Sequence, residues 1–448
     1  MTERQKAALW WDNHINEYIN DLSGYVAFPS IAEEGKDGLP FGRPCLDMLH
    51  YMKALMEKYG MKSEIISNVF ASGTLKGEKE TIAVACHGDV VPVDGKWDKD
   101  PFILYQKEDH LVGRGTTDNK GAGIAVLYAI RYLIESGYKF SHSINLLIGS
   151  AEEIGMRDVN IAFPNGNNAL LTLVPDSGFP VAYGEKSSLK AEITIEKTNS
   201  KILKLFGGSG VGVIDEATAI LTDTEGLKPN VDININGNKV TAVGKARHSA
   251  TPDEGVCALR KLLCYLDENN LLDSNLKKVI SSFVDFHGSG LNIAYQDKEE
   301  GPLTLVITKC ETLNNIFVFT LNSRFPSSVD VKTIIESIRN TFTNINVIST
   351  SQGFKTQMNG TLQKLNNIAN SVYGSSREPY VMAGGTYARA FKPAIAYGMG
   401  SPTGNAKPPF PQGEGRAHQR NESVQISRMK NGFIIYIEAL KLLDKELQ

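Results

Sequence analysis

The sequence predicts an α/β fold in which a mostly parallel sheet is flanked by helices and a second, α+β domain is inserted. Three apolar runs of β-forming residues, at 81–86, 144–150 and 170–174, predict buried strands. Between the first two, residues 121–137 show a helical period that ends at Gly137, which predicts a crossover helix. A sheet of this kind binds ligands beyond the carboxyl ends of its strands.

The length, composition and charge of the chain limit the number of domains and the kinds of partner that we expect. A chain of 448 residues is too long for one compact core, so we expect two domains. A net charge of -3 without a clustered basic run argues against nucleic acid and membrane surfaces as partners. Five cysteines without a CxxC pair do not form a disulfide framework, and neither a signal core nor a membrane-spanning run is evident. We expect a soluble, cytoplasmic protein.

The pattern along the chain predicts where the domains divide. From about residue 186 to 382, strand-like pieces (LKAEITIE, NKVTAVGKA, NIFVFTLNSRF) alternate with helical ones, without further clustered acids. A glycine- and proline-rich loop then leads to a final amphipathic helix from Ser427 to Leu447. We expect 1–185 and 383–448 to form one domain and 186–382 to be the insertion.

Carboxylates and histidines follow the predicted strands. CHGD ends the first run, and GRGTTDNKG, GSAEEIG and VPDSG come at later strand ends or beside glycines. Because the carboxyl ends of parallel strands meet at one edge, these residues are expected at one site. They are His87, Asp89, Asp118, Glu152, Glu153 and Asp176.

Imidazole and carboxylate groups without thiolates suit zinc, and also cobalt or manganese. Two metals about 3.5–4 Å apart need a bridging carboxylate, terminal ligands and a base for the attacking water. His87, Asp118, Glu153, Asp176 and His418 can supply the ligands, which leaves Glu152 as the base. Spacing does not decide between the two glutamates, although neighbours in an extended chain cannot share one ion. Asp89 is placed to orient the His87 ring.

Each of these residues has a structural alternative when taken alone. A histidine after an apolar run is more often a core residue, and an isolated Glu-Glu pair is usually a solvated loop. Asp176 and the pair Gly384–Gly385 suit turns, and Arg324 suits an exposed strand face. The joint pattern favours a metal site over coincidence.

Seven segments together resemble one known family. They are HGDVVPV, GRGTTDNKG, AEEIG, VPDSG, GKARHSATP, GGTYAR and AHQRNE, and they extend from about Ala83 to Glu422. In this order they resemble peptidase family M20, the dinuclear zinc aminopeptidases and dipeptidases. Within it they are similar to the PepV-like, carnosinase-like Xaa-His dipeptidase branch.

The resemblance implies a role for each residue of the site. His87 and Asp176 would hold one metal, Glu153 and His418 the other, and Asp118 would bridge them. Glu152 would be the general base and Asp89 the residue that orients His87. A cis peptide bond after Asp118 is also implied.

The resemblance further implies that the insertion is a lid. His248 would stabilise the oxyanion and Arg324 would grip the substrate carboxylate, with backbone N–H groups of Gly384, Gly385 and Thr386 nearby. With His248 supplied in cis, the resemblance implies a working monomer. Two positions depart from the pattern: Val211 stands where many relatives have asparagine, and Cys86 where glycine is more usual.

The function expected is hydrolysis of dipeptides or other short peptides with free amino and carboxyl termini, by a water activated at two metals. A deacylase of the same fold, acting on N-acyl amino acids, is the alternative within this chemistry. An amino-acid-binding protein without activity is the alternative from another class. It predicts a missing base or ligand, and none is missing.

Overall fold

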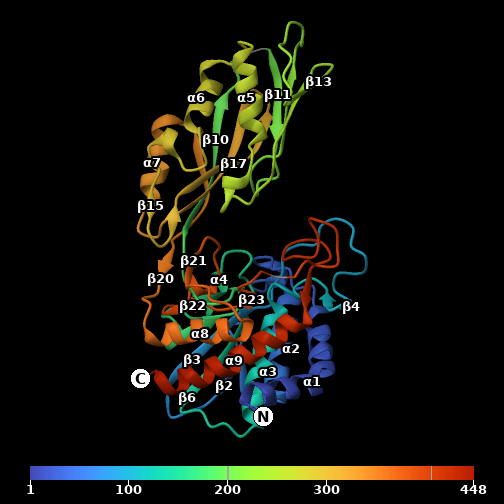
Figure 1. Cartoon of the computed structure of the whole chain (residues 1–448), viewed down its shortest axis with the longest axis vertical. Coiled ribbons are helices and arrows are strands. Elements are labelled where there is room, and N and C mark those ends of the chain that lie inside the picture. Colours follow the sequence, from blue (N-terminus) through green and yellow to red (C-terminus); the bar gives the residue numbers. More distant parts are fainter. Residues whose placement is uncertain (199–200, 405, 448) are drawn as a thin grey trace. The chain divides into compact units, whose positions relative to one another are not determined.

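The computed structural model describes residues 1–198, 201–404 and 406–447 (Figure 1). The chain divides into two compact units. Unit 1 comprises 1–184, 356–380 and 385–448, and unit 2 comprises 185–355 and 381–384. Each unit has its own hydrophobic core.

Unit 1 contains a mixed sheet whose centre is parallel. The order of the strands that belong to unit 1 is β1-β2-β6-β3-β7-β22-β9. The four central strands β6, β3, β7 and β22 run parallel, and β1, β2 and β9 pair antiparallel. These strands are β1 (Lys62–Ile66), β2 (Phe70–Leu75), β3 (Lys79–His87), β6 (His142–Gly149), β7 (Ala169–Val174), β9 (Ala182–Glu185) and β22 (Ala394–Ala396).

The register brings the carboxyl ends of the central strands together. His87, the last residue of β3, lies opposite Gly149, the last residue of β6. On the other side, Val84 of β3 lies opposite Leu173 of β7. The three predicted strands are confirmed, and the turns after them start from one edge of the sheet.

Helices cover this sheet (Figure 1). The predicted crossover helix is confirmed as α3 (Lys120–Glu135), which is buried along nearly its whole length. It packs beside α1 (Glu3–Val26), which starts at a capping box formed by Thr2 and Gln5, and beside α9 (Ile426–Glu446). The further helices of this unit are α2 (Arg43–Lys58), α4 (Arg157–Ala162), η4 (Tyr387–Arg389) and α8 (Gly360–Tyr373).

Unit 2 is an α+β unit with an antiparallel sheet in the order β13-β14-β12-β11-β17-β18-β10-β19. Its strands are β10 (Ser187–Glu196), β11 (Ile202–Gly207), β12 (Glu216–Leu221), β13 (Ile233–Asn236), β14 (Lys239–Val243), β17 (Thr304–Leu313), β18 (Ile316–Phe325) and β19 (Ile345–Ser351). The helices α5 (Ala258–Glu268), α6 (Ser274–Ser282) and α7 (Val331–Thr341) bury their apolar faces in its core.

The boundary of the insertion differs from the expected range 186–382. Residues 356–380, which include α8, belong to unit 1. Leu362, Leu365 and Ala369 of α8 are buried in the core of unit 1, where α8 packs against α9. The chain therefore returns to unit 1 about 25 residues before the predicted point, and only 381–384 go back to unit 2.

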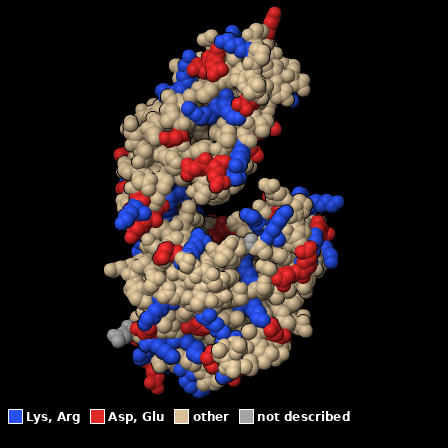
Figure 2. Space-filling view, viewed as in Figure 1, with Lys and Arg blue, Asp and Glu red and all other residues tan. Residues whose placement is uncertain are grey.

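The structure also bears on the expectations about cysteines, membrane spans and surface charge. All five cysteines are free. None of the helices in the described ranges combines the length and apolar character that a bilayer span needs. Acidic and basic side chains are interspersed on the face drawn in Figure 2.

Candidate metal centre

Asp118 links two histidines that are 331 positions apart in the chain. His87 ends β3, and His418 lies in the turn before β24 (Ser423–Gln425) with a positive φ of 64°. Oδ1 of Asp118 is 2.9 Å from Nε2 of His87, and Oδ2 is 3.0 Å from Nε2 of His418. Each oxygen of the Asp118 carboxylate therefore lies beside a different imidazole. A ligand that bridges two metals requires this arrangement.

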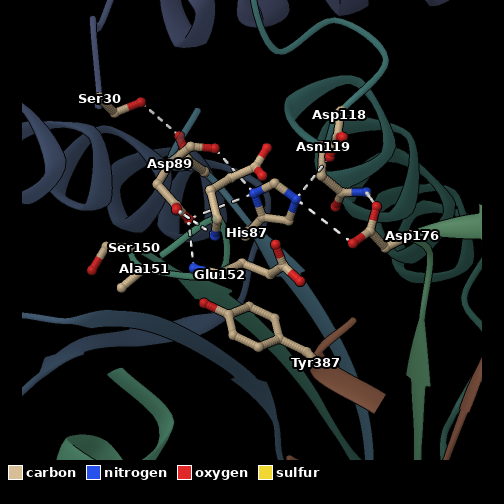
Figure 3. A network of polar contacts seen from close by, with 12 residues as sticks. Ser30, His87, Asp89, Asp118, Asn119, Ser150, Ala151, Glu152, Asp176 and Tyr387 are labelled. Atoms are coloured by element: carbon tan, nitrogen blue, oxygen red, sulfur yellow. Dashed lines mark hydrogen bonds and ion pairs between the residues drawn. The ribbon is translucent and has the colours of Figure 1, made fainter. Parts of the chain in front are cut away.

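The other predicted ligands complete two groups around this carboxylate, and Figure 3 shows the group that contains His87, Glu152 and Asp176. Oε1 of Glu153 is 3.1 Å from Nε2 of His418. Oδ2 of Asp176 is 3.7 Å from Nε2 of His87. Donor atoms of His87, Glu152 and Asp176 lie within 4.8 Å of one another, and so do those of His87, Asp118 and Glu153. The structure thus brings together all five predicted ligands and Glu152.

The donor set fits two divalent metals. It consists of imidazole nitrogens and carboxylate oxygens, the ligands that zinc, manganese and cobalt accept. Nδ1 of His87 contacts the main-chain oxygen of Asp89 at 3.0 Å. When Nδ1 carries the proton and donates it there, the lone pair of Nε2 faces Asp118 and Asp176 and is available to a metal.

The charges in the centre are strongly coupled. Hydrogen bonds to Asp118 and Glu153 raise the pKa of His418 to about 11. Burial raises the pKa of Asp118, but the hydrogen bonds donated by His418 and His87 outweigh burial and leave its pKa below the ordinary value. The carboxylates of the centre therefore favour positive charge at both imidazoles.

Glu152 has a different environment from Glu153. Its side chain is buried, and burial, opposed by the charge of His87 and reinforced by Asp176, raises its pKa well above the ordinary value. Glu153 contacts His418, which opposes the rise in pKa caused by burial. A buried carboxylate with a raised pKa beside the metal ligands is suited to accept a proton.

Asp89 holds the turn that carries both glutamates. Its Oδ1 accepts the backbone N–H of Glu152 at 3.1 Å, and its Oδ2 accepts that of Glu153 at 3.0 Å. We call a buried carboxylate that accepts two consecutive backbone N–H groups a carboxylate clip. The predicted contact with the His87 ring is made mainly by the carbonyl oxygen of Asp89, because its carboxylate lies 3.5 Å from Nδ1 and is committed to the turn.

A second carboxylate clip, which the sequence did not reveal, lies directly before the first. Oδ2 of Asp158, in α4, accepts the N–H groups of Ser150 at 2.8 Å and Ala151 at 3.0 Å. The same oxygen accepts the hydroxyl of Tyr387, which is fully buried beside His87. Gly149 allows this approach, because a Cβ there would lie 2.0 Å from the Tyr387 hydroxyl. Four consecutive backbone N–H groups, from 150 to 153, are thus held by two buried carboxylates.

A third clip holds Asp118. Oε1 of Glu422 accepts the N–H groups of Thr117 at 2.9 Å and Asp118 at 3.0 Å, and its Oε2 pairs with buried Arg114 at 2.7 Å. Glu422 stands in the AHQRNE segment, but only the fold shows its partner. The peptide bond after Asp118 is cis, as expected, and the side chain of Asn119 donates to Oδ1 of Asp176 at 3.3 Å.

The predicted lid residues lie in unit 2, where they neighbour each other. Arg324 is in β18, and partial desolvation together with the charge of Arg324 lowers the pKa of His248. His248 and Val211 line one cavity of about 660 Å³. Val211 is therefore close to His248.

The three residues of the GGT segment, 384–386, do not all belong to the same unit. Gly384 is in unit 2, whereas Gly385 and Thr386 are in unit 1. The Thr386 side chain caps η4 by accepting the N–H of Ala388. Gly385 allows the close approach of Arg389, because a Cβ there would lie 2.5 Å from its guanidinium.

Comparison with known proteins reveals clear relatives. The model of "Peptidase family M20/M25/M40" matches residues 83–442. A protein of Staphylococcus haemolyticus named as a presumed dipeptidase, SH1171, is 25% identical over 483 aligned residues, which cover 97% of this chain and 100% of the relative.

Two solved structures share the fold. The dipeptidase Dug1p of Saccharomyces cerevisiae has a TM-score of 0.61 at 14% identity, over 100% of this chain and 99% of its own. Human carnosine dipeptidase 1 has a TM-score of 0.60 at 12% identity, over 99% of each chain. At such identities the likeness confirms the predicted fold class and carries no further conclusion.

Proposed function

The chain belongs to peptidase family M20/M25/M40, and on this premise we propose that it is a metal-dependent dipeptidase acting on short peptides with free amino and carboxyl termini. The family makes it a peptidase, and relatives named as dipeptidases support the choice of substrate. The observation that carries the proposal is the position of Asp118, which directs one carboxylate oxygen to each of two histidines.

We propose that His87 and Asp176 hold one divalent metal and Glu153 and His418 the other, with Asp118 shared between them. Zinc is the metal we expect, with manganese or cobalt as alternatives. Bound there, the two ions would acidify water and polarise the scissile carbonyl.

Side chains of the protein would then accept, hold and deliver protons during the reaction. Glu152 accepts the proton of the attacking water and delivers it to the leaving amine, a task suited to its raised pKa. Asp89 and Asp158 keep Glu152 in position through the backbone of its turn. In this role they are positioning residues, because neither touches the substrate.

We also propose that unit 2 serves as the lid. His248 would donate a hydrogen bond to the oxyanion, and Arg324 would bind the carboxylate of the substrate through its planar fork. Backbone N–H groups of Gly384, Gly385 and Thr386 would assist Arg324. Because the same chain carries His248 and the metal residues, we expect an active monomer, which size-exclusion chromatography with light scattering tests.

A metal-dependence screen tests the proposed activity. The protein is stripped with a chelator, reloaded separately with zinc, manganese or cobalt, and assayed on dipeptides, tripeptides and N-acyl amino acids. We expect dipeptide hydrolysis to disappear on chelation and to return with metal. Faster turnover of N-acyl amino acids would replace the dipeptidase proposal with a deacylase, and an absence of metal-restored turnover would contradict both.

The expected compartment remains the cytoplasm, on the ground that all five cysteines are free. Fractionation of cells that express the untagged protein checks this expectation.

A further inference from the structure

Unit 1 contains another cavity, of about 490 Å³, whose lining includes none of the proposed metal ligands. It is bordered by β5 (His110–Val112), β24, the first turn of α9 and the loop that precedes His418. The lining residues are His110, Thr117, Gly404, Ala406, Pro408, Gly415, Arg416, Ala417, Ser423, Gln425 and Arg428.

Arg428 is the first sign that this cavity receives a ligand. Its Nε donates to the main-chain oxygen of Met399 at 2.9 Å. Within the described ranges, no carboxylate forms an ion pair with Arg428, and its two terminal nitrogens donate no hydrogen bond. Arg428 is half-buried and burial lowers its pKa, so the guanidinium has lost part of its hydration without gaining an anionic partner.

His110 is a second and independent sign. The residue is 7% exposed, and its Nδ1 is buried without a hydrogen-bond partner among the described residues. Burial lowers the pKa of His110, and the charge of Arg428 adds to this effect against the opposing charges of Asp109 and Glu108. An orphaned imidazole nitrogen beside an unpaired guanidinium is costly unless something occupies the space between them.

The remaining lining adds positive charge and no negative charge. Arg416 is exposed at this cavity, and none of the described lining residues is acidic. After burial, the pKa of Arg428 is influenced by Tyr373 and Tyr18 and then by the carboxylates of Asp118 and Glu422. Both are committed elsewhere, Asp118 to the two histidines and Glu422 to Arg114 and the backbone of 117–118.

We propose that this cavity binds a small molecule through an oxyanion group, either a carboxylate or a phosphate, held by Arg428, Arg416 and His110. A guanidinium matches two oxygens of such a group in its planar fork, and a neutral imidazole can donate a further hydrogen bond. The volume admits a small organic anion and exceeds what an inorganic ion alone would fill. Thr117 and Ala417 each precede a proposed metal ligand, Asp118 and His418, so the occupant would contact the two segments that carry them.

Sulfate is the probe for a first test, by isothermal titration calorimetry of the metal-loaded full chain at constant ionic strength. We expect saturable binding of one sulfate, weakened at least about tenfold in Arg428→Met and in Arg416→Gln. Lys430→Gln is the matched control, because Lys430 lies on the same helix but pairs with Asp12. Its affinity for sulfate should equal that of the wild type. Metal content, measured for every variant, separates this site from the metal centre.

The outcomes decide the proposal. Loss of sulfate affinity in both arginine variants at unchanged metal content supports it, and Arg416→Gln keeps the test valid if Arg428→Met unfolds. Unsaturable binding, wild-type affinity in Arg416→Gln, or an equal loss in Lys430→Gln would overturn it. Titration with succinate and with methyl phosphate then distinguishes the two sources of the oxyanion by their relative affinities, and binding no tighter than that of chloride would again contradict the site.

Discussion

The two ends of strand β6 carry the same interaction in different surroundings. Where β6 begins, Oδ1 of Asp444 accepts the N–H groups of Ser141 at 2.9 Å and His142 at 2.8 Å. Where β6 ends, Asp158 does the same for Ser150 and Ala151. Each carboxylate also accepts a tyrosine hydroxyl, from Tyr138 and Tyr387 respectively. Both aspartates are buried, but Ser141 and Tyr138 are more exposed than Ser150 and Tyr387, so the two carboxylate clips share the same kinds of donor and differ in the exposure of those donors.

The two ends differ in the residues next to the clip. The turn after Ser150 and Ala151 carries Glu152 and Glu153, whereas the clip of Asp444 only joins the start of β6 to the end of α9. The same contact can therefore stabilise the fold at one end and also fix a reactive side chain at the other. A measurement of unfolding free energy cannot distinguish a clip that only stabilises the fold from one that also positions Glu152, whereas a measurement of kcat can.

The largest effect is expected from Glu152, which the clip of Asp158 helps to position. Glu152→Gln keeps the shape of the side chain but cannot accept a proton, so we expect kcat to fall by about 100- to 10,000-fold. Metal content, measured by mass spectrometry, should be unchanged. Near wild-type turnover of dipeptides with both metals present would mean that Glu152 is not the base.

Removal of each clip compares the two ends directly. Asp158→Ala leaves two buried N–H groups and a buried tyrosine hydroxyl without an acceptor, and Asp444→Ala leaves the buried N–H of His142 and two part-buried donors. Each should lower the free energy of unfolding by about 1–3 kcal/mol or more, with the smaller loss in Asp444→Ala. We expect only Asp158→Ala to lower kcat as well, by about tenfold with little change in KM, since the turn with Glu152 loses its anchor.

Urea denaturation and steady-state kinetics at a temperature where both variants are folded provide the measurements. Equal losses of kcat in the two variants would show that both clips affect catalysis alike, whatever their positions in the fold. An unchanged kcat in Asp158→Ala would show that Asp89 alone positions the turn.

Substitution of the two tyrosines compares the same two clips with a smaller change. Tyr387→Phe and Tyr138→Phe each remove one hydroxyl from a clip that keeps both backbone donors, at a cost of about 1 kcal/mol. We expect a fall in kcat of a few fold in Tyr387→Phe and none in Tyr138→Phe. A fall in Tyr138→Phe would indicate that turnover responds to global stability.

The last comparison concerns the pH dependence of stability at the clip of Asp158. Burial and the charge of Asp89, opposed by the hydrogen bonds that Asp158 accepts, raise the pKa of Asp158 to about 6. In the unfolded chain its pKa is about 3.9. The folded protein then holds a proton that the unfolded chain releases, so this group's contribution to stability is complete below about pH 4 and is lost as pH rises through 6.

Asp158→Asn removes this titration. The difference in unfolding free energy between wild type and Asp158→Asn should therefore fall between pH 4 and 6 and stay level above pH 7. Urea denaturation at half-unit pH steps measures it, and a difference that is level throughout would contradict the raised pKa.

Much of this fold could be predicted because its central strands are buried on both faces. Continuous apolar runs such as 81–86 and 170–174 have few other interpretations once a helical period separates them. Most of the residues proposed as ligands could be singled out because they stand near a strand end or a glycine, whereas His418 was singled out by its place in the AHQRNE segment. The position of α8 could not, because an amphipathic helix shows the same period whichever core it covers.

The clips were missed for a related reason. Asp158 and Glu422 are single acidic residues in polar segments, and nothing local distinguishes them from solvated side chains. Their partners are backbone N–H groups, which any residue supplies, so no pattern in the partner marks the contact. For Asp89 the sequence indicated a nearby role but not which oxygen would meet the imidazole.

The split of unit 1 into segments 1–184, 356–380 and 385–448 has a consequence for the timing of assembly. Asp118 and His87 leave the ribosome early, but His418 and the carboxylate of Glu422 that anchors Asp118 come some 300 residues later. The centre therefore cannot close on a nascent or truncated chain that lacks this last segment. Assembly of the centre would therefore follow the synthesis of residues 418–422 near the end of the chain.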